Sequence, residues 1–281
     1  MSQDVPFDRR LRRVRRDRAA ARFSEADYLH RLIADEVIER LDFVKRDFRR
    51  ALDLGCAGGY LTQRLRERGL DVTSCDCGGA FARAAGGVQG DEDRLPFADG
   101  AFDLIVSVGA LDGVNDLPGA LLLARRALKP DGLFLGAFAG AGSLPRLKRA
   151  MLAADEVEGG ASARVHPQID VRAAGDLLTR AGFALPVVDS QPVDVRFRTL
   201  MDLVRDLRAM GATNVLAARS RRPLGRHALA AAIADFDSAG DKTTERFEIL
   251  HLLGWSPSPD QPRPAARGSG TVSLAQALKA R

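Results

Sequence analysis

A carboxylate followed by a cluster of glycines, within residues 53–59, is the part of this sequence best suited to bind a ligand. Asp53 lies at the end of a predicted short buried strand, residues 50–54, and three of the six residues after Asp53 are glycine. Glycine permits a tight turn and a close approach of a ligand to the backbone, which is typical of a strand-to-helix loop at a nucleotide site. Ala57 and Tyr60 stand where the dinucleotide motif G-x-G-x-x-G requires glycines. Asp53 would repel a pyrophosphate, whereas it suits a ligand that carries an ammonium group. The alternative is a glycine-rich turn that binds nothing.

A second carboxylate follows at a spacing that suits the same ligand. Asp76 ends a predicted strand at residues 71–76, about 20 residues beyond the glycine loop, where nucleotide-binding folds place the acceptor for ribose hydroxyls. A carboxylate accepts from both hydroxyls, and its charge strengthens each hydrogen bond. The alternative is that Asp76 only begins the turn at residues 77–79. Its position relative to Asp53 favours the binding role.

Alternating strands and helices must hold these residues in place. The first half of the chain alternates short apolar runs, typical of buried strands, with segments of helical periodicity. This alternation predicts an α/β fold, a mostly parallel sheet with helices on both faces. Strands are predicted at residues 50–54, 71–76, 102–108 and 133–138, helices at 60–68, 79–85 and 116–128, and a turn at 129–132.

The second half of the chain is predicted to extend the same sheet. We expect the final strand at a sheet edge, antiparallel to its neighbour. A helix with Ser24 as its N-cap is predicted to lie beside the sheet as a lid over the ligand end. The expected elements are the lid helix at 24–44, later helices at 144–157, 171–181, 199–210 and 226–236, extended segments at 185–189 and 193–197, a final strand at 244–253, and a loop at 256–270.

Two motifs resemble type 11 methyltransferases, which have the Rossmann-like fold. The glycine loop resembles their D-x-G-x-G-x-G motif, with Ala57 in place of the middle glycine. The segment 90–103 resembles their G-D-A-x-x-L-P-F…F-D motif, in which the Asp accepts from the adenine amino group. The resemblance implies S-adenosylmethionine as cofactor, with that role carried to Asp91. The expected cofactor-binding residues are Asp53, Gly55, Cys56, Ala57, Gly59, Asp76, Cys77, Asp91, Glu92 and Ser107.

Resemblance extends over nearly the full length to one branch of that family. The chain is similar to the complex I assembly factors called arginine hydroxylases and their bacterial relatives. The segments that carry this likeness are Pro6-Phe7-Asp8-Arg9-Arg10, Val114-Asn115-Asp116-Leu117-Pro118, Ala181-Gly182-Phe183, Met210-Gly211-Ala212-Thr213-Asn214 and Arg267-Gly268-Ser269. A looser resemblance reaches the malonyl-carrier-protein methyltransferases of biotin synthesis, which share the third and fourth of these segments.

The loop after the third long strand departs from those relatives. Asp112 and Gly113 stand where the relatives carry His-Trp, and the loop lies where a substrate would meet the cofactor methyl. Asp112 is the candidate catalytic base, because a protonated amine must lose its proton before it can accept a methyl group. A role in the turn alone is the alternative. His166, which precedes Pro167, is expected to cap or pack rather than to catalyse.

Three functions remain open from these residues. The first is an S-adenosylmethionine-dependent methyltransferase that acts on a protein or small-molecule acceptor, including a malonyl-carrier-protein-like acceptor. The second is an assembly factor that hydroxylates an arginine of a respiratory-complex subunit. Non-haem iron chemistry normally uses two histidines and a carboxylate, and the four histidines show no H-x-D or H-x-E pair. The third is a cofactor-binding chaperone without turnover, which the departure at Asp112 favours.

The resemblance and the predicted elements divide the chain into three parts. Residues 1–47 form a basic helical arm and lid, 48–198 the cofactor-binding Rossmann-like core, and 199–281 a helical insertion, an edge strand and a tail. The hydrophobic content of 46% is enough for a globular core. No histidine lies at metal-ligand spacing from any of the three cysteines, so we expect no metal site. We expect the cysteines to be core residues of a protein in the reducing cytoplasm. The polar N-terminus lacks a secretory signal.

The formal charge of +5 is concentrated near the N-terminus. Phe7, Leu11 and Val14 would form one apolar stripe on a helix, leaving arginines around the rest. Such an arm could contact an acidic protein, a membrane surface or RNA, or it could be a solvated helix docked by its stripe. No nucleic-acid module is recognisable, and Asp8 and Asp17 interrupt the Arg-rich pattern of a mitochondrial presequence. The arginines are Arg9, Arg10, Arg12, Arg13, Arg15, Arg16, Arg18 and Arg22.

Overall fold

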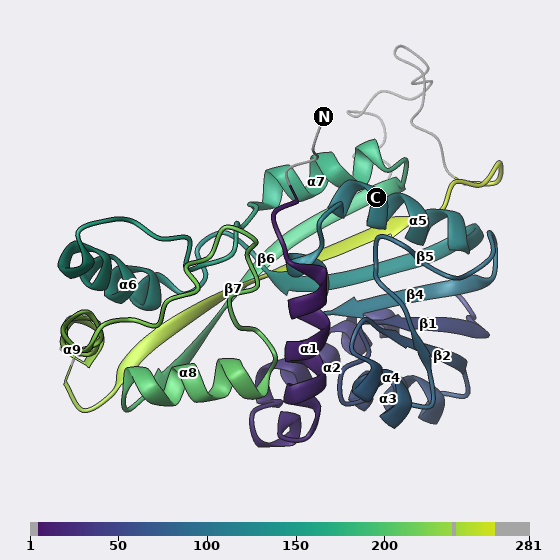
Figure 1. Cartoon of the computed structure of the whole chain (residues 1–281). Coiled ribbons are helices and arrows are strands. Elements are labelled where there is room, and N and C mark those ends of the chain that lie inside the picture. The colour runs from purple at the N-terminus through teal and green to yellow at the C-terminus, as the bar shows by residue number, and fades with distance from the viewer. Residues whose placement is uncertain (1–4, 238–239, 262–281) are drawn as a thin grey trace, which may run out of the picture.

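The computed structural model describes residues 5–237 and 240–261, and these form a single sheet with helices on both faces (Figure 1). The strand order is β3-β2-β1-β4-β5-β7-β6. Strands β1 to β5 are parallel, and β7 is antiparallel to both of its neighbours. The expected mostly parallel, doubly wound sheet is therefore confirmed. The strands are β1 Arg50–Leu54, β2 Asp71–Asp76, β3 Val88–Gln89, β4 Phe102–Val108, β5 Leu128–Ala139, β6 Ala184–Phe197 and β7 Thr243–Trp255.

The prediction that the final strand lies at the edge is wrong. β7 lies between β5 and β6, so β6 is the edge strand. β7 carries apolar residues buried on both faces, as an interior strand requires, whereas β6 is largely exposed and contains Pro192. Proline has no N–H for a ladder and is tolerated at an edge. The two extended segments predicted near this proline form one strand, and the predicted turn at 129–132 belongs to the irregular start of β5.

Two hydrophobic clusters cover the two faces of the sheet. The pleat sends Ala51 and Leu104 to one face, where they pack against α2 and α3. Leu52 and Ile105 point to the other face, against α5 and α7. The helices that form these layers are α2 Tyr28–Asp42, α3 Tyr60–Glu67, α5 Leu117–Ala127 and α7 Val171–Arg180, with the short α4 Gly79–Ala84 after β2.

Capping side chains begin α5 and α7, and the other three of these helices have no side-chain cap. Asp116 accepts from the Gly119 N–H and so begins α5. Ser24 is not the N-cap that was predicted, because residues Phe23–Glu25 form a separate 3-10 turn, η1, and α2 begins only after Asp27.

β6 and β7 continue past the parallel strands and carry a second helical layer (Figure 1). Apolar side chains of α6 Pro145–Glu158, α8 Leu200–Ala209 and α9 Arg226–Asp237 join the same cluster as α2. Buried Glu245 of β7 holds α6 in place, since it accepts from the backbone N–H groups of Arg146 and Leu147. This layer forms the far wall of the cavity described below.

The N-terminal arm is attached firmly to the sheet domain. Phe7 exchanges two hydrogen bonds with the Asn115 side chain, and the Asp8 N–H donates to the Val215 carbonyl oxygen. The helix that follows, α1 Arg9–Ala20, docks only in part by the predicted apolar stripe, since Phe7 is buried and Leu11 packs against the same cluster, whereas Val14 is exposed. Its inward face is made of arginines, which can be buried when each meets a carboxylate. Within the described residues, no helix is long and apolar enough to span a membrane.

Candidate functional site

The glycine loop between β1 and α3 is shaped by backbone conformations that favour glycine. Gly55 has φ +83°, and a Cβ atom there would lie 2.2 Å from the Ala110 Cβ. Ala57 has φ +43°, a left-handed conformation that is uncommon for a residue with a side chain. Its methyl packs with Phe23 and Phe81. The alanine at the middle position is therefore accommodated by a local apolar contact, with the loop geometry retained.

Asp53 lies beneath this loop and not in a cavity. Its side chain is on the α3 face of β1, is 1% exposed and accepts from the Thr62 hydroxyl at 2.6 Å. The Thr62 oxygen is also 2.9 Å from the Ser74 hydroxyl. Burial raises the pKa of Asp53 to about 7, although the Thr62 hydrogen bond opposes this. Asp53 thus belongs to a small polar cluster that supports the loop from below.

Asp76 ends β2 and is the most heavily hydrogen-bonded carboxylate of the site. It accepts from the backbone N–H groups of Ala57 and Gly78 and from the guanidinium of Arg16. Burial alone would raise the pKa of Asp76, but Arg16 and the two backbone donors outweigh burial and lower it. Desolvation alone would lower the pKa of Arg16, but the charge of Asp76 and its hydrogen bonds, with a smaller effect of Cys77, together outweigh it and raise the pKa.

Three consecutive acids, Asp91 to Asp93, lie next to Asp76 along α1. Arg13 donates to Asp91 at 2.5 Å, and Arg12 makes a bidentate pair with Glu92 at 2.6 and 2.8 Å. The pairs along the helix are Arg9 with Asp93, Arg12 with Glu92, Arg13 with Asp91 and Arg16 with Asp76. We call these four arginine side chains the inner arginines.

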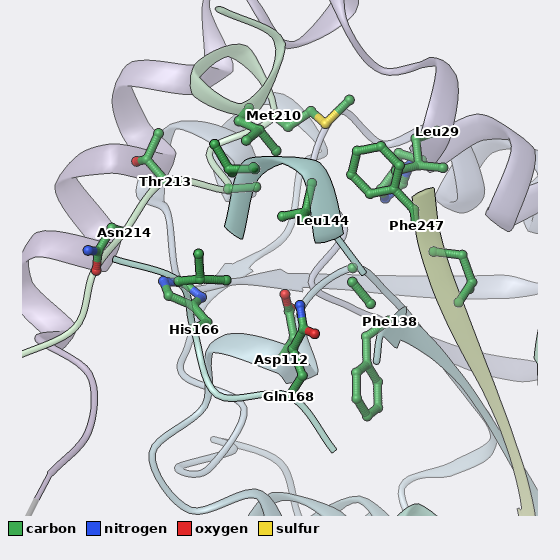
Figure 2. A pocket seen from close by; sticks show the side chains of 18 of the residues that line it. Leu29, Asp112, Phe138, Leu144, His166, Gln168, Met210, Thr213, Asn214 and Phe247 are labelled. Atoms are coloured by element: carbon green, nitrogen blue, oxygen red, sulfur yellow. The ribbon is translucent and has the colours of Figure 1, made fainter. Parts of the chain in front are cut away.

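A cavity of about 280 Å³ opens at the carboxyl ends of β1, β4 and β5 (Figure 2). This is the place where ligands bind in open α/β sheets. Figure 2 shows polar side chains, among them Asp112, His166 and Gln168, gathered on one side of the cavity and Phe138 and Phe247 on the other. Of the predicted site residues, Ala57 and Asp112 line this cavity.

Asp112 and His166 both line the polar side of the cavity, and both side chains are partly exposed. Asp112 lies on the 3-10 turn η2 Leu111–Gly113, directly after β4. Burial raises the pKa of Asp112, and the nearby His166 and Arg12 oppose this only in part. Burial lowers the pKa of His166, and its Nε2 accepts from the Val215 N–H at 3.1 Å, so the ring is neutral. His166 also packs edge-on against Phe7, which confirms the expected packing role.

His30 is a cavity residue that the sequence reasoning missed. Neither ring nitrogen has a hydrogen-bond partner among the described residues, and burial lowers its pKa to about 4. His30 lies in the segment whose helical periodicity predicts the lid helix, and no local sequence pattern distinguishes it from the other residues of that helix. The inner arginines were also missed as site residues. Their spacing of i, i+3, i+4 and i+7 was the available signal, because it places all four on one helix face.

The remaining predicted residues lie around the loop without lining the large cavity, and partly exposed Gly59 precedes α3 with φ +79°. Ser107 is fully buried, and its hydroxyl donates to the Leu54 carbonyl oxygen, which ties β4 to β1. The three cysteines are free and buried, and burial raises the pKa of Cys56, Cys75 and Cys77. No group of three metal-ligating side chains occurs among residues 5–237 and 240–261.

The strand order with a reversed β7, the glycine loop after β1 and the carboxylate after β2 define the Rossmann-like class I methyltransferase fold. Residues 52–136 match the family model described as a methyltransferase domain. A solved structure, the putative methyltransferase of Haloferax volcanii in complex with the activator Trm112, aligns with a TM-score of 0.53 at 19% identity and covers 89% of this chain and 99% of its own.

Two curated relatives match over almost the entire chain. The Arginine-hydroxylase NDUFAF5, mitochondrial, of Danio rerio is 34% identical and covers 97% of this chain and 89% of its own length. A malonyl-[acyl-carrier protein] O-methyltransferase of Laribacter hongkongensis is 31% identical, over 92% of this chain and 93% of its own. The chain therefore belongs to the type 11 S-adenosylmethionine-dependent methyltransferases. The expected family and its cofactor, S-adenosylmethionine, are confirmed.

Proposed function

We propose that the carboxylates along α1 and the glycine loop hold S-adenosylmethionine. Asp76 would accept from the ribose hydroxyls, and Asp91 with Glu92 would lie at the adenine. The loop residues Gly55, Cys56, Ala57 and Gly59 would wrap the methionine part, with Cys77 beside the adenosine and with Asp53 and Ser107 supporting the loop from within. The chemistry of these acceptors fits the cofactor, since buried carboxylates can accept hydrogen bonds from its hydroxyl and amino groups and can balance its positive charge.

We propose further that the methyl acceptor has an apolar body and a reacting amine or hydroxyl group. The cavity that extends from Ala57 towards β7 has a largely apolar lining, with Phe138, Leu144 and Phe247 among its residues. Of its two lining arginines, Arg16 belongs to α1, and Arg164, the one outside α1, already pairs with Asp155. A carboxylate acceptor would therefore find no unpaired lining arginine outside α1 and would face Asp112. Like charges at short range disfavour such a complex.

Asp112 carries this proposal because it is the one carboxylate among the described residues that line the acceptor cavity. Bound S-adenosylmethionine supplies an electrophilic methyl group on a positive sulfur. Asp112 would accept the N–H or O–H proton of the acceptor, while neutral His166 fixes the adjacent wall and the apolar lining excludes water. The deprotonated nitrogen or oxygen of the acceptor would then take the methyl group that the bound cofactor supplies, with its proton held on Asp112. Positioning of the two reactants supplies most of the rate.

A transfer assay with labelled methyl tests the acceptor chemistry. The cofactor is incubated with the protein and with alkyl amines, alkanols, fatty carboxylates and a malonyl thioester of a carrier protein. We expect label on the amine or hydroxyl compounds. Asp112→Asn should lower kcat by about 10²–10⁴-fold and leave cofactor affinity in calorimetry unchanged. Transfer to the malonyl thioester with an undiminished rate in Asp112→Asn would show that the acceptor is a carboxylate.

Hydroxylation of an arginine in a respiratory-complex subunit is the second candidate, favoured by the name of the Danio rerio relative. The described residues offer no cluster of three ligating side chains from which a metal-dependent route could be argued. Mass spectrometry of the subunit after deletion of the gene tests this function. Hydroxylation that persists in the deletion strain would eliminate it.

We also infer that an acidic protein docks on the outward face of α1. Arg15 is partly buried, and its pKa is lowered by burial and by the neighbouring Arg219, Arg18 and Arg208. Because like charges repel, an anionic partner at this surface would be attracted and would relieve the repulsion. A double variant, Arg15→Gln with Arg18→Gln, should weaken binding of an acidic carrier protein in a salt-dependent manner. Equal binding by the variant, or binding only to anionic vesicles, would contradict this partner.

A further inference from the structure

Arg16 saturates the carboxylate that the proposed function assigns to the cofactor ribose. The Oδ1 atom of Asp76 accepts from the Gly78 N–H at 2.7 Å and from Arg16 Nε at 2.8 Å. Its Oδ2 atom accepts from the Ala57 N–H at 3.1 Å and from Arg16 Nη2 at 2.5 Å. A carboxylate has about four acceptor positions. No position of Asp76 is left for a ribose hydroxyl while Arg16 remains in place.

The docked helix also cancels the charge that would attract the cofactor. S-adenosylmethionine is a cation overall, because its sulfonium and ammonium groups outnumber its carboxylate. The inner arginines pair with the four acids at positions 76, 91, 92 and 93. A cationic ligand would therefore meet guanidinium groups, and not free carboxylates, along this edge of the site.

Close backbone contacts show that α1 is fitted to this position. A Cβ atom at Gly78 would lie 2.9 Å from the Arg16 Cβ, and one at Gly211 would lie 3.3 Å from the Ala19 Cβ. Glycine therefore lets α1 approach both the turn after β2 and the loop after α8. The Arg16 guanidinium lies over the Phe81 ring at 5.0 Å, which adds a cation–π contact to the ion pair.

We propose that α1 is an autoinhibitory latch, in which Arg16 occupies Asp76 in place of the cofactor ribose. This inference rests on the proposed cofactor site. The cofactor-competent state is then the one in which Arg16 has left Asp76. The apparent affinity for cofactor is lower than the intrinsic affinity by the fraction of molecules in that state.

Calorimetry of S-adenosylmethionine with the full chain tests the latch. Arg16→Gln should bind about tenfold or more tightly than the wild type, since a competent fraction of one tenth or less limits the wild type. Arg10→Gln is the matched control, because it removes the same charge from an exposed position of the same helix. Its affinity should stay within about twofold of the wild type, given the screening of exposed charges by salt. An Arg16→Gln affinity equal to or weaker than that of Arg10→Gln overturns the latch.

Hydrogen exchange of the wild-type protein gives a test that does not depend on a variant. On addition of S-adenosylmethionine, the latch predicts faster exchange of α1 amides together with slower exchange in the glycine loop. Slower exchange in both segments would show that α1 clamps the cofactor, which overturns the latch. Failure of both the wild type and Arg16→Gln to bind S-adenosylmethionine would refute the cofactor site itself, and the latch with it.

Discussion

Replacement of Asp53 by asparagine should change the pH dependence of stability. Asp53 is fully buried beside Thr62, and its pKa is raised from 3.8 to about 7. A folded-state pKa above the unfolded value means that the folded state holds the proton more strongly. Stability is therefore unaffected by this group below pH 4, falls as the pH rises towards 7, and stays reduced above it. At 1.36 kcal/mol per pKa unit, the full cost is about 4 kcal/mol.

An asparagine side chain has nearly the shape of a protonated aspartic acid and does not ionise. In urea unfolding, Asp53→Asn should exceed the wild type by about 1 kcal/mol at pH 4.5 and by up to about 4 kcal/mol at pH 8. Asp71→Asn is a suitable control, because the Asp71 side chain is 77% exposed and its loss should change stability by less than about 0.5 kcal/mol at both pH values. A difference between Asp53→Asn and the wild type that is the same at the two pH values would refute the reasoning.

Two further predictions concern the stability of variants at the glycine loop and at His30. Gly55→Ala and Gly69→Ala both place a side chain at a φ above +80°, but only the first meets a close neighbour, the Ala110 Cβ. In chemical denaturation, Gly69→Ala should lower the free energy of unfolding by about 1 kcal/mol, and Gly55→Ala should lower it by about 1–3 kcal/mol more. Equal losses in the two variants would mean that the backbone near Gly55 shifts without cost to accommodate the new side chain. His30→Leu removes two unpartnered buried nitrogens and should raise the unfolding free energy by about 1 kcal/mol. A lower melting temperature in thermal unfolding would show that His30 is satisfied by a partner such as bound water.

The sequence predicts the sheet well because strand and helix periodicities are local. Asp76 and Asp91 were assigned to one site from their places after consecutive strands, and the structure brings both to the same face of α1. The position of β7 was not predictable in this way, since pairing between β5 and β6 depends on which strand can be buried on both faces.

The parts of the site that were missed depend on long-range contacts. The pleat turns Asp53 towards Thr62 and away from the cavity, which a motif match does not reveal. The sequence predicts that the apolar stripe of α1 faces inward, because the inward face of an amphipathic helix is normally identified by its apolar residues. The structure instead buries Arg16 at 7% exposure, where one bidentate acid compensates its charge. The motif Arg267-Gly268-Ser269 and most of the predicted loop 256–270 lie outside the described residues.

The separation of α1 from its partners along the chain has a consequence for folding. The inner arginines pair with acids that lie 60 to 84 residues further on. With 12 residues, α1 is also at the lower limit of length for a stable isolated helix, about 12–15 residues. On a growing chain, α1 therefore has no partner until β1, β2 and the segment with the three acids have been made. The first helix to be synthesised therefore meets the acids that pair with it only after the chain has been made as far as residue 93.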